Sequence, residues 1–445
     1  MPAASSFSAF QAPSGTRDVL PPESGQWELL MATFARIAHG ANYGLILTPI
    51  FEDFGLFHRG IGVATDVVGK EMYELTDKGG RHLALRPEVT ASVVRAFVQH
   101  RPTLPWKVFY CGPNFRYERP QAGRYRQFYQ VGLEALGPDD PVLDVEIIEL
   151  AWDYFAALGL TRLDLRINSL GDDQCRPAYR EMLRAYLAER RSRLCPEHQE
   201  RLDDNPLRVL DCKKEPCREV VTGAPVQLDT LCGACAQHFG LVRDGLTRAG
   251  VAFRVDPRLV RGLDYYTRTT FEISALALNS AQDAIGGGGR YDTLVESLGG
   301  PPTPGMGFSS GLERTLLACG AEGIDLDSQG PVPLDVFVVD VAGGSDGADV
   351  TRQLRRAGLR ADQAFGSRSL KGQFKAADRS GAPLAVVIGP DEVAAGTIGL
   401  RRMRTGAGDE RQVSVARVDV VARIVEELAQ SNTEPVKADE KTMRQ

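Results

Sequence analysis

The chain has 445 residues, enough for two to four domains of roughly 100 to 200 residues each. With 43% hydrophobic and 25% charged residues, eight cysteines and a net charge of −6, it is not a collagen-like, coiled-coil or disordered chain, a disulfide scaffold or a non-specific polyanion binder. No apolar run approaches the roughly 18 residues of a membrane span, and residues 1–15 lack a secretory signal pattern, so we expect a cytoplasmic protein without membrane contact.

The first 170 residues alternate between helical and strand patterns. After an Ala-, Ser- and Pro-rich stretch at 1–14, which we expect to be a flexible tail, apolar residues recur at helical spacing from Gly25 to Gly40. Further helices are expected over Pro87–Gln99, which starts at a proline, and over 143–158. The β-prone runs between and after these helices are Leu45–Phe51, Arg81–Leu85, Trp106–Tyr110, Arg126–Leu133 and Leu163–Ile167.

A charged, helix-prone stretch from about 172 to 250 carries most of the cysteines and predicts a helical insertion. Strand patterns return at Val260–Ile273 and Gly307–Ser310. The glycine run Gly286–Gly289 separates these two strands.

The pattern changes after Ser328–Pro333, whose two prolines indicate a linker. Strands and helices then alternate, which predicts a compact α/β domain over 331–430, and the polar residues 431–445 are expected to be disordered. The expected strands are Leu334–Asp340, Leu384–Ile388 and Thr397–Met403, and the expected helices are Gly347–Ala357, Leu370–Ser380 and Val418–Leu428.

Arginines are densest in the segment Phe115–Gln127, where four of them flank a loop that contains Pro120 and Gly123. Guanidinium groups make paired, charge-assisted hydrogen bonds to phosphate, so this loop is a candidate anion site. A solvated hairpin tip is the alternative interpretation. Because Phe115 and Phe128 indicate buried strands on both sides of the loop, we expect some of the arginines to face a cleft.

A second segment, Val260–Thr269, brings a cation, an acid and two phenols within six residues. Such groups recognise a polar heterocycle through hydrogen bonds, although the same pattern is typical of a strand with an aromatic core face. The glycines of Gly286–Gly289 and Gly305–Arg314 allow the backbone to approach a ligand closely, but they lack Walker or dinucleotide-binding spacing. In Arg86–Thr90, an acid and a hydroxyl lie at a strand-to-helix turn, where a carboxylate can also simply cap the helix.

Taken together and in this order, these segments resemble the histidyl-tRNA synthetases, a family of class II aminoacyl-tRNA synthetases, from about Gly15 to Leu428. The segment most specific for this family is Arg261–Tyr266, which resembles its histidine-specific signature. The other matching segments are Gly15–Asp18 (the N-terminal signature), Thr48–Ile50 (motif 1), Phe115–Gln130 (motif 2), Gly305–Arg314 (motif 3), and Ser369–Lys371 with Ile388, Gly389 and Glu392 (the anticodon-binding domain).

The resemblance implies an α+β fold: an antiparallel-sheet catalytic domain over 15–330 with the helical insertion, and a C-terminal α/β anticodon-binding domain. It implies a homodimer that uses ATP with Mg²⁺ to convert L-histidine to histidyl-adenylate, with release of pyrophosphate, and that then transfers the histidyl group to the 3′ end of tRNA(His). The alternative is the non-catalytic, synthetase-like regulatory subunit of ATP phosphoribosyltransferase. That paralogue typically lacks the anticodon domain, which is predicted here.

The resemblance also assigns roles to individual residues. Arg116 and Arg261 would act on the α-phosphate as catalytic residues, and Arg314 would bind the γ-phosphate. The complete set implied for the nucleotide is Arg116, Glu118, Arg261 and Arg314. The set implied for histidine is Glu88, Thr90 and Gln130 at the amino group, Glu134 and Tyr266 at the imidazole, and Tyr265 in the same pocket. Gln121 and Arg124 would meet the acceptor end of the tRNA.

The cysteines of the insertion have spacings that a tetrahedral zinc ion could use, especially if the fold brings two pairs together. The candidates are Cys195 with His198, Cys212 with Cys217, and Cys232 and Cys235 with His238. No single four-ligand spacing stands out, so buried free thiols in a helical insertion remain the alternative interpretation.

Overall fold

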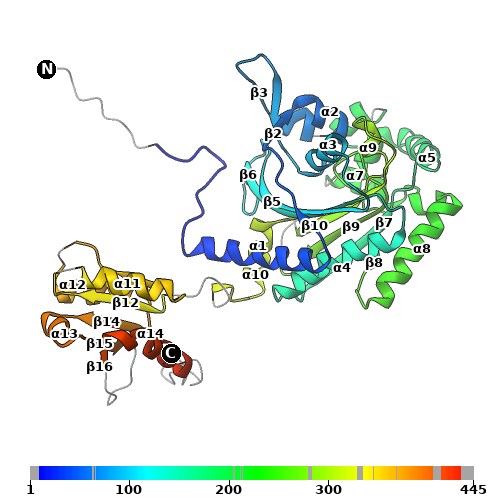
Figure 1. The fold of residues 1–445 in the computed structure, drawn as a ribbon. Coiled ribbons are helices and arrows are strands. Elements are labelled where there is room, and N and C mark those ends of the chain that lie inside the picture. Colours follow the sequence, from blue (N-terminus) through cyan, green and yellow to red (C-terminus); the bar gives the residue numbers. More distant parts are fainter. Residues whose placement is uncertain are drawn as a thin grey trace, which may run out of the picture. The chain divides into compact units, whose positions relative to one another are not determined.

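A computed structural model describes the chain as two compact units, Met1–Gly330 and Pro331–Gln445 (Figure 1). The described residues are 10–62, 65, 67–203, 206–210, 212, 214–278, 283–327, 334–343, 345–366, 368–403 and 412–431. The predicted linker at 328–333 and the predicted tail beyond 431 lie outside this set, as do residues 1–9 of the predicted N-terminal tail. Within the described residues, no helix is both long and apolar enough to span a membrane.

The first unit is built on an eight-stranded sheet with the order β1-β5-β6-β11-β10-β9-β7-β8. The six inner strands pair antiparallel, and only the two-residue edge strands β1 and β8 pair parallel to their neighbours. The sheet is therefore of the antiparallel kind predicted. Its strands are β1 (Gly44–Leu45), β5 (Trp106–Phe115), β6 (Gln127–Leu136), β7 (Leu163–Ser169), β8 (Arg254–Val255), β9 (Thr267–Ala275), β10 (Ala284–Arg290) and β11 (Gly305–Gly311).

Two long helices, α1 (Glu23–Gly40) and α4 (Pro141–Ala157), cover one face of this sheet together with α8 (Gly233–Arg248) and α10 (Leu312–Ala321) (Figure 1). The period-two alternation of strand side chains decides which residues they bury. On β6, the odd-numbered Val131, Leu133 and Ala135 join the core beneath these helices. The even-numbered residues of β6 consequently point to the other face.

Helices α2 (Phe54–Ile61), α3 (Thr90–His100) and α9 (Leu294–Ser297) lie over that other face at one side of the sheet (Figure 1). A second core cluster joins α3 to the even-numbered Val108 and Tyr110 of β5. Beside it, a small sheet is formed by β2 (Phe51–Asp53), β3 (Tyr73–Thr76) and β4 (His82–Leu85).

The strands differ from the sequence predictions in three places. The β-prone run Leu45–Phe51, which Pro49 interrupts, contributes only its two ends to strands, and these strands, β1 and β2, lie in different sheets, because Pro49 cannot donate a ladder hydrogen bond. Residues 260–266 form no strand, and β9 starts only at Thr267. There the neighbouring Tyr265 and Tyr266 are both buried, so the stretch does not alternate.

The third difference concerns the glycine run, which was not expected to be a strand but forms the central strand β10, between β9 and β11. Glycine is required there by close packing. A Cβ atom on Gly288 would lie 2.0 Å from the carbonyl oxygen of Gly307, and one on Gly289 would lie 2.7 Å from that of Thr269. A strand without side chains leaves the middle of the sheet bare, which creates room for a ligand.

The insertion contains α5 (Arg176–Ala188), α6 (Pro196–Arg201), α7 (Glu215–Thr222) and the longer α8, joined by short 3₁₀ turns. It has a small core of its own, which includes Leu183, Leu187, Leu202 and Val220. Cys195 and Cys217 are buried in the same cluster.

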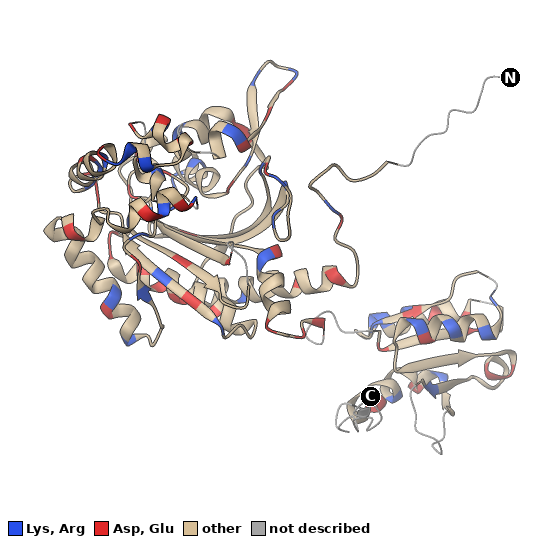
Figure 2. Ribbon diagram, turned by 180° about the vertical axis from the view of Figure 1, so that it is seen from behind, with Lys and Arg blue, Asp and Glu red and all other residues tan. Residues whose placement is uncertain are grey.

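The second unit has a mixed five-stranded sheet with the order β13-β12-β14-β15-β16. Its central strands β12 and β14 are apolar and buried, as their sequences predict. The strands are β12 (Val336–Asp340), β13 (Ala361–Gln363), β14 (Leu384–Ile388), β15 (Thr397–Arg402) and β16 (Gln412–Ala416), and the helices are α11 (Asp346–Arg356), α12 (Leu370–Ser380), α13 (Pro390–Ala395) and α14 (Val420–Ser431). Acidic and basic residues are interspersed over both units (Figure 2), in keeping with the small net charge.

Candidate active site

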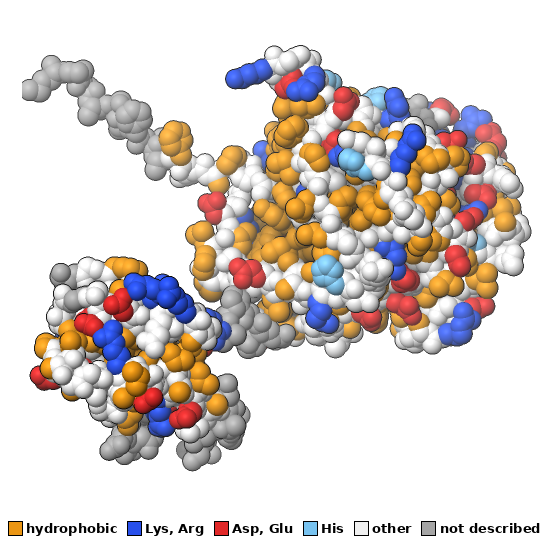
Figure 3. Space-filling view, in the orientation of Figure 1, with side chains coloured by type: hydrophobic (Ala, Val, Ile, Leu, Met, Phe, Trp, Pro, Cys, Tyr) orange, Lys and Arg blue, Asp and Glu red, His pale blue; other side chains and the backbone are white. Residues whose placement is uncertain are grey.

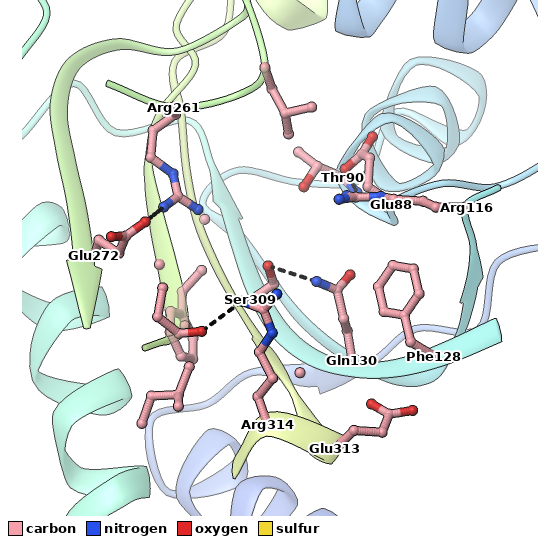
Figure 4. Close-up of a pocket in the computed structure, with 18 of the residues that line it drawn as sticks. Glu88, Thr90, Arg116, Phe128, Gln130, Arg261, Glu272, Ser309, Glu313 and Arg314 are labelled. Atoms are coloured by element: carbon pink, nitrogen blue, oxygen red, sulfur yellow. Dashed lines mark hydrogen bonds and ion pairs between the residues drawn. The ribbon is translucent and has the colours of Figure 1, made fainter. Parts of the chain in front are cut away.

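A cavity of about 260 Å³ lies over the inner strands of the antiparallel sheet. Ten of the twelve site residues expected from the sequence line it: Glu88, Thr90, Arg116, Glu118, Arg124, Gln130, Arg261, Tyr265, Tyr266 and Arg314. Figure 4 shows Arg261 facing Thr90, Glu88 and Arg116 across this space. Segments that are 226 positions apart in the sequence, from Glu88 to Arg314, therefore contribute to one site.

The cavity is lined by four arginines and four glutamates: Arg116, Arg124, Arg261 and Arg314, and Glu88, Glu118, Glu272 and Glu313. The Nε atom of Arg116 donates to the carbonyl oxygen of Pro87 at 3.0 Å, and its guanidinium lies 5.3 Å from the centre of the Phe128 ring. Arg314 donates to the carbonyl oxygen of Ala284 at 3.0 Å. Burial and the nearby Arg124 lower the pKa of Arg314. Guanidinium groups that repel one another in a partly buried cleft are the expected environment for a polyanionic ligand.

Arg261 is held by Glu272 of β9, whose Oε2 accepts from Arg261 Nη1 at 2.7 Å. Burial alone would lower the pKa of this arginine, but Tyr266 and Glu272 outweigh that effect and raise it. A Cβ atom on Gly287 would lie 2.8 Å from Arg261 Nη1, so the bare strand β10 is what gives the guanidinium its place.

Glu88 caps helix α3, as the structural alternative suggested, and also lines the cavity. Its two carboxylate oxygens accept from the backbone N–H groups of Thr90 at 2.7 Å and Ala91 at 2.8 Å. Burial raises its pKa. The cap fixes one carboxylate at the helix N-terminus, where it faces the cavity beside Thr90.

Glu134 does not line the cavity but lies directly behind it, 1% exposed. Its carboxylate accepts from the hydroxyls of Thr90 and Tyr291, both at 2.6 Å, and burial raises its pKa to about 8. Tyr265 and Tyr266 line the cavity itself. Both side chains are largely buried, and their ring centres lie 4.7 Å apart. This end of the cavity is thus a phenol-rich pocket with a carboxyl group at its base.

Gln130, on the open face of β6, is oriented by two neighbours. Its Oε1 atom accepts from Asn114 Nδ2 at 2.8 Å, and its Nε2 atom donates to Ser309 Oγ at 3.4 Å (Figure 4). Glu313, at the start of α10, accepts from the backbone N–H of Tyr129 at 3.0 Å, and burial raises its pKa to about 7.

Gln121 is the other predicted residue outside the cavity lining. It is exposed in the hairpin between β5 and β6, where it forms an isolated β-bridge with Arg124. Arg124 itself lines the cavity and makes an ion pair with Glu118. The hairpin therefore has an inner side that faces the cavity and an outer side that does not.

Several lining residues were not singled out from the sequence, notably Tyr110, Glu272, Tyr291 and Ser309. Tyr291 lies two residues after the glycine run Gly286–Gly289, and Ser309 lies within the segment Gly305–Arg314, so proximity to those segments was an available signal. Glu272 and Tyr110 were visible only as residues of expected strands. Their contribution depends on which neighbouring strand each one pairs with.

The cysteines of the insertion form two separate clusters. One contains Cys195, His198, Cys212 and Cys217, so two of the predicted pairs do come together. Cys232 and Cys235 instead lie with Asp172 and Cys175, two residues that were not among the predicted zinc ligands.

His238 belongs to neither cluster, because its Nε2 atom lies 2.8 Å from Asp144 Oδ2. Its predicted grouping with the cysteines Cys232 and Cys235 was therefore wrong. On helix α8, one turn beyond Cys235, its side chain packs toward α4 instead.

A family model described as histidyl-tRNA synthetase matches residues 15–315, and one described as anticodon binding domain matches residues 335–427. The chain belongs to the histidyl-tRNA synthetase family. Histidine–tRNA ligase of Moorella thermoacetica is 50% identical over 411 residues, which covers 91% of this chain and 96% of that protein. Histidine–tRNA ligase of Halothermothrix orenii is 48% identical over 94% of this chain and 98% of its own length.

The crystal structure of apo histidyl-tRNA synthetase from Staphylococcus aureus has a TM-score of 0.78 at 35% identity and covers 94% of this chain and 100% of its own. A Bacillus halodurans structure titled as an ATP phosphoribosyltransferase regulatory subunit/histidyl-tRNA synthetase has a TM-score of 0.61 at 20% identity, a likeness of fold alone. These matches confirm the predicted family, the predicted fold class and the predicted class of enzyme, an aminoacyl-tRNA ligase.

Proposed function

We propose that this synthetase activates L-histidine with ATP, releasing pyrophosphate, and then transfers the histidyl group to the 3′ end of tRNA(His). The observation that carries the proposal is a single cavity whose lining combines four arginines with the carboxyl group of Glu88 and the phenols of Tyr265 and Tyr266. Such a cavity can hold a nucleoside triphosphate and a polar amino acid side by side, as the adenylation reaction requires.

In the first step, a carboxylate oxygen of histidine attacks the α-phosphorus of ATP, and the bond from that phosphorus to the pyrophosphate oxygen breaks. Arg116 and Arg261 would hold the α-phosphate from opposite sides of the cavity, and Arg314 would hold the γ-phosphate. Fixed guanidinium groups stabilise the negative charge that grows on the five-coordinate phosphorus. Mg²⁺ prefers oxygen ligands, so Glu118, Glu272 and Glu313, whose carboxylates line the same cavity, would help to hold this ion, which would offset the negative charge of the nucleotide.

The amino-acid end accounts for the choice of histidine. Glu88 and Gln130 would bind the α-ammonium group beside Thr90, because both present side-chain oxygens near the cavity. Glu134 and Tyr266 would bind the imidazole nitrogens. A site built from a carboxyl group and phenols leaves those groups unpaired when an apolar side chain enters, and such sites reject the wrong ligand strongly, by about 10⁴-fold or more.

The exposed side of the hairpin between β5 and β6 suits the tRNA. Gln121 would meet its acceptor end there, and Arg124 would meet it from the inner side of the hairpin. The second unit, which matches the anticodon-binding family, would bind the anticodon. Only local positive surfaces are needed for these contacts, so the net charge of −6 is no obstacle.

A homodimer is the quaternary state we propose. Four large apolar residues next to the motif 1 proline are exposed in the single chain: Leu45, Leu47, Ile50 and Phe51. Hydrophobic side chains gather on the face of the first unit shown in Figure 3. Exposed apolar clusters of this kind commonly mark a surface that another chain covers.

Charging of a tRNA(His) transcript with radiolabelled histidine tests the proposal. The synthetase should charge this transcript with histidine and leave other transcripts uncharged. Failure of the folded protein to charge it would favour the regulatory-subunit alternative. Two observations argue against that alternative. The predicted arginines Arg116, Arg261 and Arg314 all line the cavity, and residues 335–427 match the anticodon binding domain.

A further inference from the structure

The helical insertion carries a four-residue cluster that the adenylation site does not use. The side chains of Cys195, His198, Cys212 and Cys217 each offer one ligand atom, and these four atoms all lie within 4.8 Å of one another. His198 Nδ1 lies 3.2 Å from Cys195 Sγ and 3.6 Å from Cys217 Sγ. In a zinc tetrahedron with Zn–S bonds of about 2.3 Å, ligand atoms stand about 3.5 to 3.8 Å apart.

We propose that Cys195, His198, Cys212 and Cys217 bind one structural zinc ion. Three thiolates and an imidazole form a closed tetrahedral set, which is typical of zinc sites that hold a fold together. The proposal rests on this geometry and is independent of the proposed synthetase reaction.

The surroundings of the cluster also fit a metal site. The backbone N–H of Cys195 points at Cys217 Sγ, with the nitrogen and sulfur 3.3 Å apart. Hydrogen bonds of this kind orient metal-bound sulfur atoms and reduce their charge. Cys195 and Cys217 are buried, whereas His198 and Cys212 are partly exposed, so an ion could enter from one side.

A disulfide is a poorer explanation of the same cluster. All eight cysteines are free thiols in this structure. A single disulfide would use two of the three sulfur atoms and would leave the third thiol and His198 without a reason to lie there. A zinc ion accounts for all four side chains together.

The insertion has a physical need for such an ion. Its helices α6 and α7 have six and eight residues, and helices this short are not stable on their own. Their core spans only about 50 residues, a size at which a metal or disulfide commonly supplements hydrophobic packing. The four ligands come from the start of α6, from the loop after the 3₁₀ turn Pro206–Val209, and from the first turn of α7. One ion would therefore join three separate segments.

The ion would also fix a contact between the insertion and the short helical turn Val67–Glu71 of the first unit. Glu197, which lies between two of the ligands in the sequence, forms ion pairs with Lys214 at 3.2 Å and with Lys70 at 3.6 Å. Lys70 precedes Glu71, whose carbonyl oxygen accepts from the backbone N–H of Tyr117 at the hairpin between β5 and β6. Zinc would hold Glu197 in place and, through Lys70, link the insertion to the region beside the active site.

The test is the zinc content of the full-length protein, purified without chelators and measured by mass spectrometry. We expect at least one equivalent per chain, and the loss of one equivalent in the double variant Cys212→Ser/Cys217→Ser. The matched control is Cys111→Ser/Cys319→Ser, because these two cysteines lie outside both clusters. That variant should keep the zinc content of the unsubstituted chain.

Because the insertion has a second candidate cluster, the number of zinc ions per chain and the variant that lowers it show which cluster binds the ion. Its members, Asp172, Cys175, Cys232 and Cys235, also lie within 4.8 Å of one another. Two equivalents, of which Cys212→Ser/Cys217→Ser loses one, would confirm the proposal and place a second ion at the other cluster. A zinc content that Cys212→Ser/Cys217→Ser leaves unchanged would overturn it, and so would zinc that only Cys232→Ser/Cys235→Ser removes.

A second measurement covers the case in which the double variant does not fold. Zinc is removed from the unsubstituted protein with a chelator, and Co²⁺ is added in steps. We expect the thiolate-to-cobalt charge-transfer absorption of a tetrahedral site and a rise in the thermal unfolding midpoint. A folded protein that contains no zinc and gives no such absorption with Co²⁺ would refute the site.

Discussion

Arg261 and Glu272 form an ion pair inside the candidate active-site cavity, with Nη1 and Oε2 2.7 Å apart. The other oxygen of the same carboxylate accepts from Arg166 at 2.5 Å, so Glu272 is held from behind. The Nε atom of Arg261 is buried and makes no hydrogen bond within the described part of the chain. Glu272 thus fixes one edge of the guanidinium, and the buried Nε is a donor that a bound phosphate would satisfy.

Gly287 tests whether this position of Arg261 matters. In Gly287→Ala, the new methyl group would lie 2.8 Å from both Arg261 Nη1 and the carbonyl oxygen of Phe271, so the guanidinium must move. A displacement of about 1 Å at a catalytic group costs on the order of 10²-fold in rate. We expect kcat of ATP–pyrophosphate exchange to fall by about that factor.

The matched control for this experiment is Gly320→Ala. A Cβ atom on Gly320 meets no other atom within 4 Å, so this variant should keep the activity of the unsubstituted protein. Equal kcat values for Gly287→Ala and Gly320→Ala would show that Arg261 tolerates displacement.

The buried carboxyl group of Glu134 should make the stability of the ligand-free protein depend on pH. Burial raises its pKa from 4.5 to about 8, so the folded state holds a proton that the unfolded state releases. The stabilisation is complete below about pH 4.5 and is lost as the pH rises through about 8. At about 1.4 kcal/mol per pKa unit, the upper limit is a few kcal/mol.

Thermal unfolding midpoints from about pH 5 to about pH 9 check this prediction. Glu134→Gln carries no titrating group, so its midpoint should decline less with rising pH than that of the unsubstituted chain. Parallel profiles for the two proteins would mean that Glu134 is ionised in the folded state over this whole range.

The sequence predicted the fold where local pattern and long-range packing agree. The helix Leu370–Ser380 and the strand Leu384–Ile388 are found with the predicted bounds, because each has an unambiguous apolar pattern. The pattern failed at β10, since four glycines carry no hydropathy signal and only the neighbours Gly307 and Thr269 explain them.

The residues of the candidate active site were likewise predicted where they lie in sequence motifs and missed where only the fold brings them to the cavity. Motif residues such as Arg116 and Arg314 could be named because each one lies in a recognisable segment. Glu272 and Tyr110 lie in ordinary strands, and their place at the cavity depends on strand order. Likewise, the sequence separates Cys175 from Cys232 by 57 positions, and only the fold brings these two cysteines together.

A substitution of Gln121 should affect the transfer to tRNA but not the activation of histidine. It is exposed on the hairpin and does not line the cavity, so Gln121→Ala should keep ATP–pyrophosphate exchange within about twofold. If it contacts the acceptor end, loss of that hydrogen bond should lower kcat/KM for tRNA charging by about tenfold. Both rates would be measured on the same preparation, and equal losses in the two assays would contradict the assignment.

Leu47 is 78% exposed beside the motif 1 proline, and we expect a second chain to cover it. An aspartate at this position would bury a charge in the interface, which is costly, so Leu47→Asp should shift the protein from dimer to monomer. Light scattering after size-exclusion chromatography gives the mass directly. Val418→Asp is the control, because Val418 is 82% exposed in the second unit and should leave the mass unchanged. An unchanged dimer for Leu47→Asp would place the interface elsewhere.

The most direct test of the account is amino-acid-dependent ATP–pyrophosphate exchange with the unsubstituted protein and with Arg261→Ala. Arg258→Ala serves as a control, because Arg258 contacts the insertion and lies outside the cavity lining. We expect exchange with histidine alone among the amino acids, a loss of about 10²- to 10³-fold in Arg261→Ala and little change in Arg258→Ala. Folded protein that shows no exchange with histidine, or an Arg261→Ala variant as active as the unsubstituted chain, would contradict the account.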